Sequence, residues 1–523
     1  MQRNLVIGID SSTTATKAIA WDRTGAAVAE GRAAIPLAQP RPRYFEQEPE
    51  DWWRSTSLAL RELTAKVEPA RIAGVAISNQ RETFGLFGEH GEPIRPAIVW
   101  LDERAIDQMR RFGASFGAEK IHAISGKPVD ITPCLYRMVW LRENEPHLLD
   151  RAAYIAEVHG YLCFRLTGRW TTSTASADPL GVLDMERLVW SQEILAAAGV
   201  PIDKMLPLVR PAAFIGTVTE AAAQTTGLPA GTPIFAGGGD GQCAGTGVDV
   251  LRSGRAYINL GTAVVSGSYS ERYAFDAAFR TETAVADRGY IVETCLRSGT
   301  FLVDWMSREM LGIDPQRELE ALTALEAEAS ASPVGANGVM LVPYWEGCMT
   351  PYWDPSARGV IAGLSGSTRR GDLYRALLEG VALEQALASK RSQGGSGLTI
   401  DHYVAVGGGT ASDLWMQILA DAAGVPVHRS ASKEASSLGA AMAAATGCGW
   451  FRSFTEASAA MAGHIVRTFE PRPKEKAAYA ELGEIYAGLW PALSSWNQKL
   501  ARFVEQRTAK LQSKTGTKEA GAT

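Results

Sequence analysis

The chain of 523 residues lacks the cysteine and histidine patterns that mark disulfide frameworks and zinc sites. Its six cysteines are scattered and form no CxxC pair, and its seven histidines show no HxxxH or HExxH spacing. The cysteines show no regular spacing, which argues against a disulfide framework, and a zinc site would need closely spaced cysteine or histidine pairs. We therefore expect reduced, mostly buried thiols and no zinc-dependent hydrolase.

Long apolar runs and an excess of positive charge are also missing. No apolar run approaches the roughly 18 residues that suggest a membrane span, and the amino end lacks the charged and apolar regions of a signal peptide. The net charge of -5 and the pI near 5.9 argue against a broad basic surface for nucleic acid. We expect a cytoplasmic protein that binds a small molecule, with neither a membrane nor nucleic acid as partner.

Two catalytic motifs are absent or misleading. The sequence contains no GxxxxGK[ST], which excludes a P-loop kinase. Residues 113–117 match the hydrolase elbow GxSxG, but residues 107–112 before them are polar and helical in pattern, where an elbow needs an apolar strand. We interpret the match as coincidence. An esterase that acts through Ser115 stays as a minor alternative, which predicts labelling by a serine-reactive phosphonate.

The length and the periodicity predict two α/β lobes. A single core stops growing near ~250 to 300 residues, so 523 residues favour two domains. Short apolar runs alternate with helical stretches in both halves. The predicted strands are 5–9, 19–21, 72–78, 98–100, 232–236, 256–259, 290–293, 338–343 and 403–406, and the predicted helices include 52–67, 373–389 and 414–422. Residues 506–523 have almost no large apolar side chains, which predicts a disordered tail.

Two similar turns lie about half a chain apart. Residues 7–14 read as a strand that ends in a Ser-Ser-Thr-Thr turn, and residues 257–265 repeat the order of strand, Gly-Thr turn and strand. Small polar turns offer backbone N–H groups and hydroxyls that suit phosphate oxygens. Either turn alone could be a plain hairpin, but the pair suggests related lobes around a shared cleft. We place the boundary at residue 250, with domains 1–250 and 251–505.

Asp240 is a lone carboxylate among glycines. It follows the apolar run 232–236, with glycines at 237, 238, 239 and 241. Glycines allow close approach of a ligand, and an unshielded carboxylate can take a proton from an attacking hydroxyl. An Asx turn or a helix cap is the alternative. Asp10 ends the first strand and suits Mg2+, which takes one or two carboxylates together with phosphate oxygens, although it could also cap its turn.

Three further segments could line a ligand site. The glycines 407–409 follow a strand and precede a helix, whose amino end could receive a nucleotide. Arg81 and Glu82 end an apolar strand, where they could bond several hydroxyls or form a solvated salt-bridged turn. Trp100 could form an apolar wall against sugar carbons or be an ordinary core tryptophan.

Taken together, these segments resemble the FGGY family of carbohydrate kinases. That family belongs to the larger group of sugar kinases, actin and heat-shock ATPases, which share a duplicated ribonuclease-H-like domain. The resemblance covers about residues 4 to 470, in the segments GIDSSTTATK, SNQRET with AIVW, GGGDGQCAG, INLGT and GGGTASDLWMQILAD. It implies two ribonuclease-H-like α/β domains with an ATP cleft between them, and transfer of the γ-phosphate of ATP, with Mg2+, to a hydroxyl of a small sugar or polyol.

The resemblance also implies roles for single residues. Asp240 would be the catalytic base, and Asp10 would help to hold Mg2+. The nucleotide would be bound by Thr13, Thr14, Lys17, Gly261, Thr262, Gly408, Gly409 and Ser412. The substrate would be contacted by Arg81, Glu82, Trp100 and Gln242. The chain departs from the family pattern at Ser12, where a glycine is usual, and at Asp413, which adds a charge beside the adenosine turn.

The acceptor stays open between two branches of the family. Residues 80–83 and 351–355 resemble glycerol kinases, yet Thr132 stands where a tyrosine is expected. The turn 260–263 and the strand 341–344 resemble xylulokinases, which usually carry Met-His where this chain has Arg81 and Glu82. A pentulose such as xylulose is the favoured acceptor, and glycerol or a related polyol is the alternative. An actin-like nucleotide-gated binding protein is the rival from another class, and a homodimer is possible.

Overall fold

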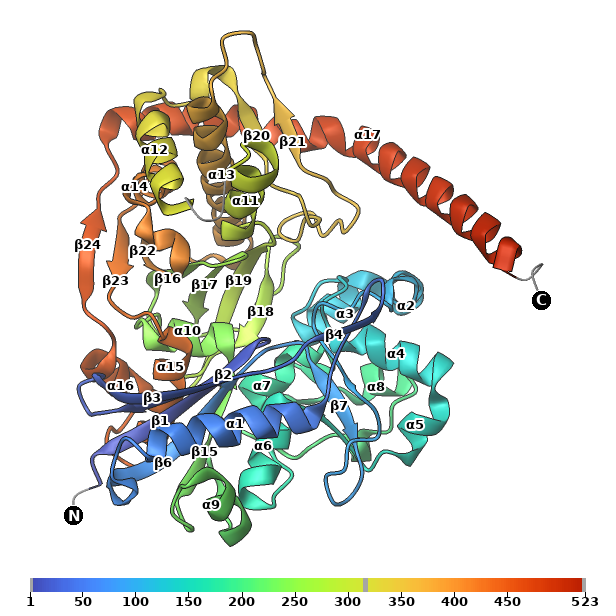
Figure 1. Ribbon diagram of the computed structural model, residues 1–523, viewed down its shortest axis with the longest axis vertical. Coiled ribbons are helices and arrows are strands. Elements are labelled where there is room, and N and C mark those ends of the chain that lie inside the picture. The colour runs from blue at the N-terminus through green and yellow to red at the C-terminus, as the bar shows by residue number, and fades with distance from the viewer. Residues whose placement is uncertain (1–2, 314–317, 520–523) are drawn as a thin grey trace.

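The computed structural model describes residues 3–313 and 318–519, which form two lobes, each built on a mixed sheet (Figure 1). The first sheet has the order β14-β15-β6-β1-β2-β3. Its strands are β1 (Leu5–Ser11), β2 (Ala15–Trp21), β3 (Ala27–Ala34), β6 (Ile72–Asn79), β14 (Phe214–Thr217) and β15 (Pro233–Gly239). The second sheet has the order β18-β19-β17-β16-β22-β23-β24. Its strands are β16 (Gly254–Leu260), β17 (Val264–Ser270), β18 (Arg280–Thr283), β19 (Tyr290–Leu296), β22 (Ile400–Val406), β23 (Val427–Ser430) and β24 (Ile465–Phe469).

The two sheets repeat one topology. Each starts with an antiparallel hairpin, β1 with β2 and β16 with β17, and a third antiparallel strand, β3 or β19, extends it. On the other side of the first strand, β6 and then β15 pair in parallel in the first lobe, as β22 and β23 do in the second. The repeat confirms that the lobes are related, as the paired turns suggest, and it is the duplicated ribonuclease-H-like fold that the family resemblance implies.

A smaller sheet extends the first lobe. It has the order β4-β5-β8-β7-β9, with strands β4 (Ala38–Arg41), β5 (Tyr44–Gln47), β7 (Phe84–Phe87), β8 (Ala97–Ile98) and β9 (Tyr154–Glu157). The helices α2 (Ile106–Phe112), α3 (Ala118–Ser125), α4 (Cys134–Asn144) and α5 (Pro146–Arg151) lie beside it (Figure 1). Two-stranded sheets join β10 (Thr172–Ser173) to β13 (Leu208–Val209), β11 (Leu183–Asp184) to β12 (Val189–Trp190), and β20 (Met340–Val342) to β21 (Val360–Ala362).

Two helices join the lobes through a shared core. α10 (Asp240–Gly247) and α15 (Ala435–Gly447) cross so closely that a Cβ on Gly439 would lie 1.9 Å from the carbonyl oxygen of Cys243. α15 also reaches the first sheet, because the hydroxyl of Ser437 donates to the carbonyl oxygen of Gly8 (2.9 Å). One apolar cluster therefore contains residues of both sheets, including Val6, Ala76, Tyr257 and Val404.

The remaining helices are divided between the two lobes. In the first lobe these are α1 (Pro49–Thr64), α6 (Val158–Thr167), α7 (Thr174–Ala177), α8 (Gln192–Ala197) and α9 (Glu220–Thr226). In the second they are α11 (Thr300–Trp305), α12 (Glu318–Ala331), α13 (Arg370–Ser396), α14 (Asp413–Ala423) and α16 (Phe454–Met461). The first part of the last helix, α17 (Pro473–Glu519), packs on the second lobe through Tyr479, Tyr486 and Trp490, and its carboxy-terminal part projects beyond the body of the molecule (Figure 1).

Most predicted elements are present with shifted ends, and three expectations need comment. The strand predicted at 98–100 ends at Ile98, because the N–H of Trp100 donates to the hydroxyl of Thr83 (3.2 Å) and leaves the ladder. Residues 113–117 continue a helix, and the hydroxyl of Ser115 donates to the carbonyl of Phe112, so no strand-to-helix elbow exists there. The backbone of 506–519 is helical where a disordered tail is expected, and 520–523 lie outside the described residues.

Candidate active site

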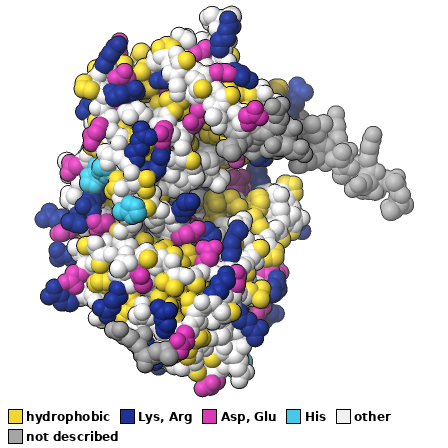
Figure 2. Space-filling model, turned by 60° about the vertical axis from the view of Figure 1, so that its left-hand side comes forward, with side chains coloured by type: hydrophobic (Ala, Val, Ile, Leu, Met, Phe, Trp, Pro, Cys, Tyr) yellow, Lys and Arg dark blue, Asp and Glu magenta, His cyan; other side chains and the backbone are white. Residues whose placement is uncertain are grey.

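The carboxyl ends of three parallel strands bring Asp10 and Asp240 to one edge of the first sheet. Asp10 on β1 is in register with Ser78 on β6, and Ser78 is in register with Gly238 on β15. Neighbouring strands lie about 4.8 Å apart, so the backbones of Asp10 and Gly238 are about 10 Å apart. The surface is hollowed between the two lobes (Figure 2). Such an edge is where ligands bind in open α/β sheets.

Asp240 begins α10 and has one carboxylate oxygen available. Its Oδ1 accepts the N–H of Gly241 (2.7 Å) and lies 3.1 Å from Nε of Arg81. Within 3–313 and 318–519, Oδ2 has no hydrogen-bond or ion-pair partner, and the side chain is 40% exposed. Burial raises the pKa of Asp240, while Arg81 and the Gly241 N–H oppose that rise. A carboxylate held by one oxygen and open at the other can accept a proton from a bound hydroxyl.

Asp10 is suited to a divalent cation. The hydroxyl of Ser78 donates to its Oδ1 (3.2 Å), and burial together with the nearby charge of Asp240 raises the pKa of Asp10 to about 7. A divalent cation would relieve the repulsion between these two carboxylates. No group of three or more His, Cys, Asp or Glu side chains in the described part of the chain could hold a metal by itself. Mg2+ would therefore need phosphate oxygens and water to complete its shell, as is usual for this ion.

The polar turn of the first lobe is tied to its neighbours. The carbonyl of Thr13 accepts from the side chain of Gln47 (2.6 Å), and its hydroxyl accepts from Nε1 of Trp100 (2.8 Å). Thr14 is exposed at the tip of the turn. Lys17, on β2, forms an ion pair with Glu434 of the second lobe (2.5 Å). The predicted phosphate-binding lysine thus has a carboxylate partner that phosphate oxygens would have to replace.

The two turns of the second lobe are adjacent. A Cβ on Gly407 would lie 2.5 Å from Oδ1 of Asn259, and one on Gly261 would lie 3.4 Å from the same atom. The carbonyls of Gly261 and Thr262 accept from the N–H groups of residues 300 and 299. Nothing lies within 4 Å of a Cβ placed on Gly408, so this turn borders open space. Gly409 is buried beneath it.

Ser412 and Asp413 stand at the amino end of α14. The hydroxyl of Ser412 accepts the N–H of Trp415 (3.0 Å), so its side chain caps the helix. Asp413 pairs with Arg429 (2.6 Å) and with Arg467. The extra charge beside the expected adenosine turn is therefore matched by two arginines of the same lobe.

Arg81 and Glu82 belong to a buried group of six charged side chains, which we call the interlobe charge cluster. Its members are Arg81, Glu82, Lys127, Arg280, Glu282 and Glu293. The first three belong to the first lobe, and the last three lie on β18 and β19 of the second. Each is at most 8% exposed. Three cations face three carboxylates, so the cluster is formally neutral.

Ion pairs within the cluster keep its strongest acid charged. Burial would raise the pKa of Glu293, but Arg81 and Arg280 outweigh burial and lower it to about 2. The hydroxyl of Tyr257 also donates to Glu293 (3.0 Å). A fully buried carboxylate with three donors is stable as an anion.

Arg137 connects the segment before Trp100 with the segment that contains Thr132 through hydrogen bonds. Its guanidinium donates to the carbonyl of Val99 (2.5 Å), next to Trp100, and to the carbonyl of Thr132. Trp100 is 36% exposed. Gln242 donates to the carbonyl of Ala175 (2.9 Å) and to Asp178 (3.2 Å), while its buried Oε1 has no hydrogen-bond partner among the described residues.

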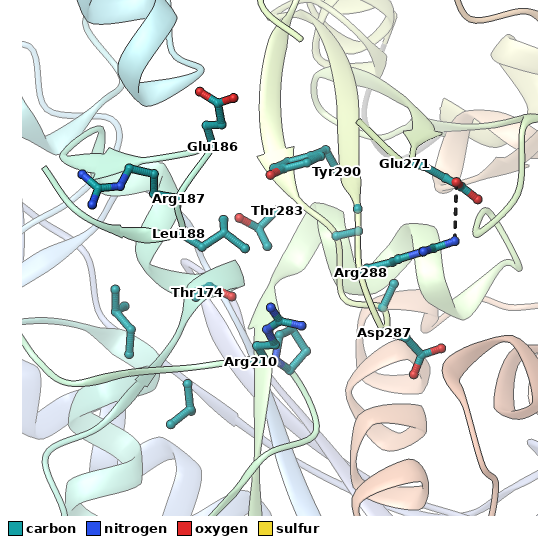
Figure 3. A pocket seen from close by; sticks show the side chains of 16 residues that line it. Thr174, Glu186, Arg187, Leu188, Arg210, Glu271, Thr283, Asp287, Arg288 and Tyr290 are labelled. Atoms are coloured by element: carbon teal, nitrogen blue, oxygen red, sulfur yellow. Dashed lines mark ion pairs between the residues drawn. The ribbon is translucent and has the colours of Figure 1, made fainter. Parts of the chain in front are cut away.

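A cavity of about 440 Å³ lies at the seam of the lobes, between Leu188 and Arg210 of the first lobe and Arg288 and Tyr290 of the second (Figure 3). The cavity is lined by three arginines, Arg187, Arg210 and Arg288, and by three carboxylates, Glu186, Glu271 and Asp287. This balance of charge does not select an anion or a cation. The N–H of Thr283 at its wall donates to Asp178, so the cavity borders the acceptor side without containing Asp240.

Sequence reasoning missed the second-lobe half of the charge cluster. Arg280 and Glu282 are two residues apart on β18, so both side chains point to the same face of the strand, and Arg280 is the cross-strand neighbour of Glu293. The available signals were the two charged residues at alternate positions of β18 and the one glutamate within the mostly apolar sequence of β19. Glu434, the partner of Lys17, had no comparable signal.

The geometry can now be compared with known proteins. The family model for the FGGY family of carbohydrate kinases, N-terminal domain, matches residues 5–247, and the C-terminal domain matches residues 256–448. The chain belongs to the FGGY family of carbohydrate kinases. It is therefore a phosphotransferase that uses ATP and an alcohol group of a carbohydrate as acceptor.

Relatives and solved structures cover nearly the whole chain. A xylulose kinase of Bacillus subtilis is 31% identical over 507 residues, which cover 95% of this chain and 99% of the relative. A glycerol kinase of Citrifermentans bemidjiense is 33% identical over 487 residues, 89% of this chain and 94% of the relative. The crystal structure of xylulose kinase from Rhodospirillum rubrum has a TM-score of 0.88 at 26% identity and covers 94% of this chain and 100% of that one. No helix among the described residues is long and apolar enough to cross a membrane.

Proposed function

We propose that this FGGY kinase phosphorylates a neutral pentulose such as xylulose, with Asp240 as the base. The role of Asp240 as base rests on the different surroundings of its two carboxylate oxygens. Oδ1 is held by Arg81 and Gly241, and Oδ2 is left for the proton of the sugar hydroxyl. The deprotonated hydroxyl then attacks the γ-phosphorus in line, the bond from that phosphorus to the bridging oxygen of ADP breaks, and the proton stays on Asp240.

Mg2+ and the polar turns would supply the phosphate side of the reaction. When bound, Mg2+ offsets the charge of the phosphates, with Asp10 among its ligands. Lys17 and the turn with Thr13 and Thr14 approach from the first lobe. The turns with Gly261, Thr262, Gly408, Gly409 and Ser412 approach from the second. Exclusion of water by the two lobes would limit hydrolysis of ATP when no sugar is bound.

The charge balance of the acceptor side favours a neutral sugar. Arg81, Arg280 and Lys127 each have a carboxylate partner within 3.3 Å. An acidic sugar would have to displace one of these carboxylates to gain a cation of its own, which is costly for buried pairs. Xylulose kinases that match 93% to 96% of this chain support a pentulose. Thr132 is also shorter than the tyrosine expected in glycerol kinases, which suits a longer acceptor.

Glycerol is the second candidate acceptor. The adjacent Arg81 and Glu82 and the 33% identity to a glycerol kinase favour it. We further propose domains 1–250 and 251–505, a cytoplasmic location and a homodimer, which solution measurements of the full chain can test. An actin-like binding protein without kinase activity would not need a carboxylate oxygen free to accept a proton, as Oδ2 of Asp240 is.

The test is ADP release by purified protein with xylulose, other pentuloses, pentitols, glycerol, aldonates and hexoses. We expect the highest kcat/KM with xylulose and little turnover of aldonates. Asp240→Asn should lower kcat by at least about 1000-fold and leave the affinity for ATP nearly unchanged, because the base acts only in the transition state. Wild-type turnover by Asp240→Asn would refute the role of Asp240 as the base. Absence of ADP release with every compound of the panel would refute the choice of acceptor.

A further inference from the structure

Two of the side chains expected to contact the sugar, Arg81 and Glu82, take ion-pair partners from the opposite lobe. Nη1 of Arg280 lies 2.7 Å from Oε1 of Glu82, and Nη1 of Arg81 lies 3.0 Å from Oε2 of Glu293. Arg81 and Glu82 follow the first sheet, whereas Arg280 and Glu293 lie on β18 and β19 of the second. The acceptor side of the first lobe is thus held by the second.

Arg280 uses the fork of its guanidinium to bridge two carboxylates. Its Nη1 donates to Oε1 of Glu82, while Nε and Nη2 lie 2.7 and 2.6 Å from Oε1 of Glu293. A planar guanidinium can make these directed contacts together, and a lysine cannot. The backbone of Glu82 has a φ of 47°, a conformation that a side chain disfavours and that persists only where its surroundings fix it. Arg280 holds the side chain of this residue by the ion pair to Oε1.

The same cluster reaches the base through Arg81. Glu293 holds Nη1 of Arg81, and Nε of that side chain lies 3.1 Å from Oδ1 of Asp240. The start of α10 is fitted against this pair, because a Cβ on Gly241 would lie 3.1 Å from both Cζ of Arg81 and Oε2 of Glu293. The orientation of the Asp240 carboxylate therefore depends on side chains of β19.

We propose that Arg280 and Glu293 are positioning residues of the acceptor site. From the second lobe they fix Glu82 and Arg81, and through Arg81 they fix the Asp240 carboxylate. This inference rests on the proposed role of Asp240 as the base. It makes the acceptor site a joint product of both lobes, complete only when β18 and β19 lie against residues 81 and 82. None of the residues predicted to bind the nucleotide is a member of the interlobe charge cluster.

The first test is steady-state kinetics of Arg280→Gln in the full-length enzyme, with D-xylulose or, if that is the better acceptor, glycerol. Misplacement of a reacting group by about 1 Å can cost about 100-fold in rate. We expect kcat/KM for the sugar to fall about 10- to 100-fold and the KM for ATP to change less than about threefold. Glu293→Gln should behave in the same way.

Loss of stability has to be separated from loss of positioning. Arg375→Gln is the matched control, because Arg375 and Glu379 form another buried pair (2.7 Å) on α13. It should lower Tm as Arg280→Gln does and leave the sugar kinetics unchanged. If Arg280→Gln does not fold, Arg280→Lys keeps the charge but loses the fork, and it should show the same selective loss for the sugar.

A double-mutant cycle tests the contact itself. Glu82→Gln combined with Arg280→Gln should lose less kcat/KM than the product of the two single losses, because the two side chains share an ion pair, although the contact of Arg280 with Glu293 adds a loss of its own. Fully multiplicative losses would overturn the proposal, as would wild-type sugar kinetics in Arg280→Gln, or equal losses for sugar and ATP. Asp240→Asn in the same assay distinguishes the two ways in which the proposal can fail. Activity in Asp240→Asn would refute the role of Asp240 as the base, whereas an inactive Asp240→Asn with a fully active Arg280→Gln would refute only the positioning role.

Discussion

At the scale of single residues, Asp10 combines a functional position with a cost to stability. Its pKa is raised to about 7 in the folded protein by burial and by Asp240, from 3.8 for an ordinary aspartate. The folded state thus binds more protons than the unfolded chain between these pH values, so stability is lost as pH rises from about 4 to about 7. An ionised Asp10 without a metal strains the edge of the first sheet.

The prediction is that Asp10→Asn stabilises the metal-free protein at pH 8 while it weakens catalysis. Its Tm in the presence of EDTA should exceed that of the wild type at pH 8, and the difference should shrink at pH 5, where Asp10 is protonated in the folded wild type. Differential scanning fluorimetry at the two pH values measures this. Ser78→Ala serves as control, since it removes the hydrogen bond to Asp10 without removing its charge. An unchanged difference between pH 5 and pH 8 would contradict the raised pKa.

Single residues also show what a sequence pattern can and cannot predict. Asp240 is recognisable because four glycines surround it, and glycine around a lone carboxylate is a local pattern. Arg280 and Glu293 are not recognisable in this way, because their partners Glu82 and Arg81 are about 200 residues away in the chain. Long-range ion pairs leave no local pattern beyond a charged residue in a strand.

At the scale of secondary-structure elements, the crossing of α10 and α15 sets the position of the base. α10 begins with Asp240, and α15 lies against it with Gly439 facing the backbone of Cys243. The hydroxyl of Ser436 also donates to the carbonyl of Asp240 (3.1 Å). Close helix crossings of this kind require a residue without a Cβ.

Gly439→Ala should therefore destabilise the protein and reduce activity together. The added Cβ would lie 1.9 Å from a backbone oxygen, so the helices must separate, at a cost of about 1 to 3 kcal/mol or more. Gly394→Ala in α13 is the control, because nothing lies within 4 Å of its Cβ, and alanine favours a helix by up to about 1 kcal/mol. Urea unfolding and kcat measure both effects. Equal stability of the two variants would show that the crossing tolerates a wider spacing.

The order of elements was predictable, but the location of one helix was not. Alternating apolar runs indicate the strands of both sheets, and the paired turns indicate the repeat. α15 lies late in the second-lobe sequence yet contacts the first sheet, at Gly8 of β1 and at Trp21 of β2. An alanine-rich helix that is apolar on every face gives no information about which sheet it will cover.

At the scale of the whole molecule, the shared core couples the two lobes. The cluster that contains α10 and α15 includes strands of both sheets, and the interlobe charge cluster adds buried ion pairs across the same seam. Separation of the lobes would expose apolar surface and break these pairs together. Two domains with a polar contact would behave as independent units, but a shared core removes that independence.

We therefore predict a single calorimetric unfolding transition for residues of both lobes. The phosphate turns lie on both sheets, so a non-hydrolysable ATP analogue with Mg2+ should shift the whole transition upward. Saturation to 100 times Kd adds about 2.7 kcal/mol. Lys17→Met should reduce this shift, whereas Lys66→Met, which breaks an exposed pair with Glu62, should not. Two resolved transitions, of which the nucleotide moves only one, would show that the lobes unfold separately and that α10 and α15 do not couple them.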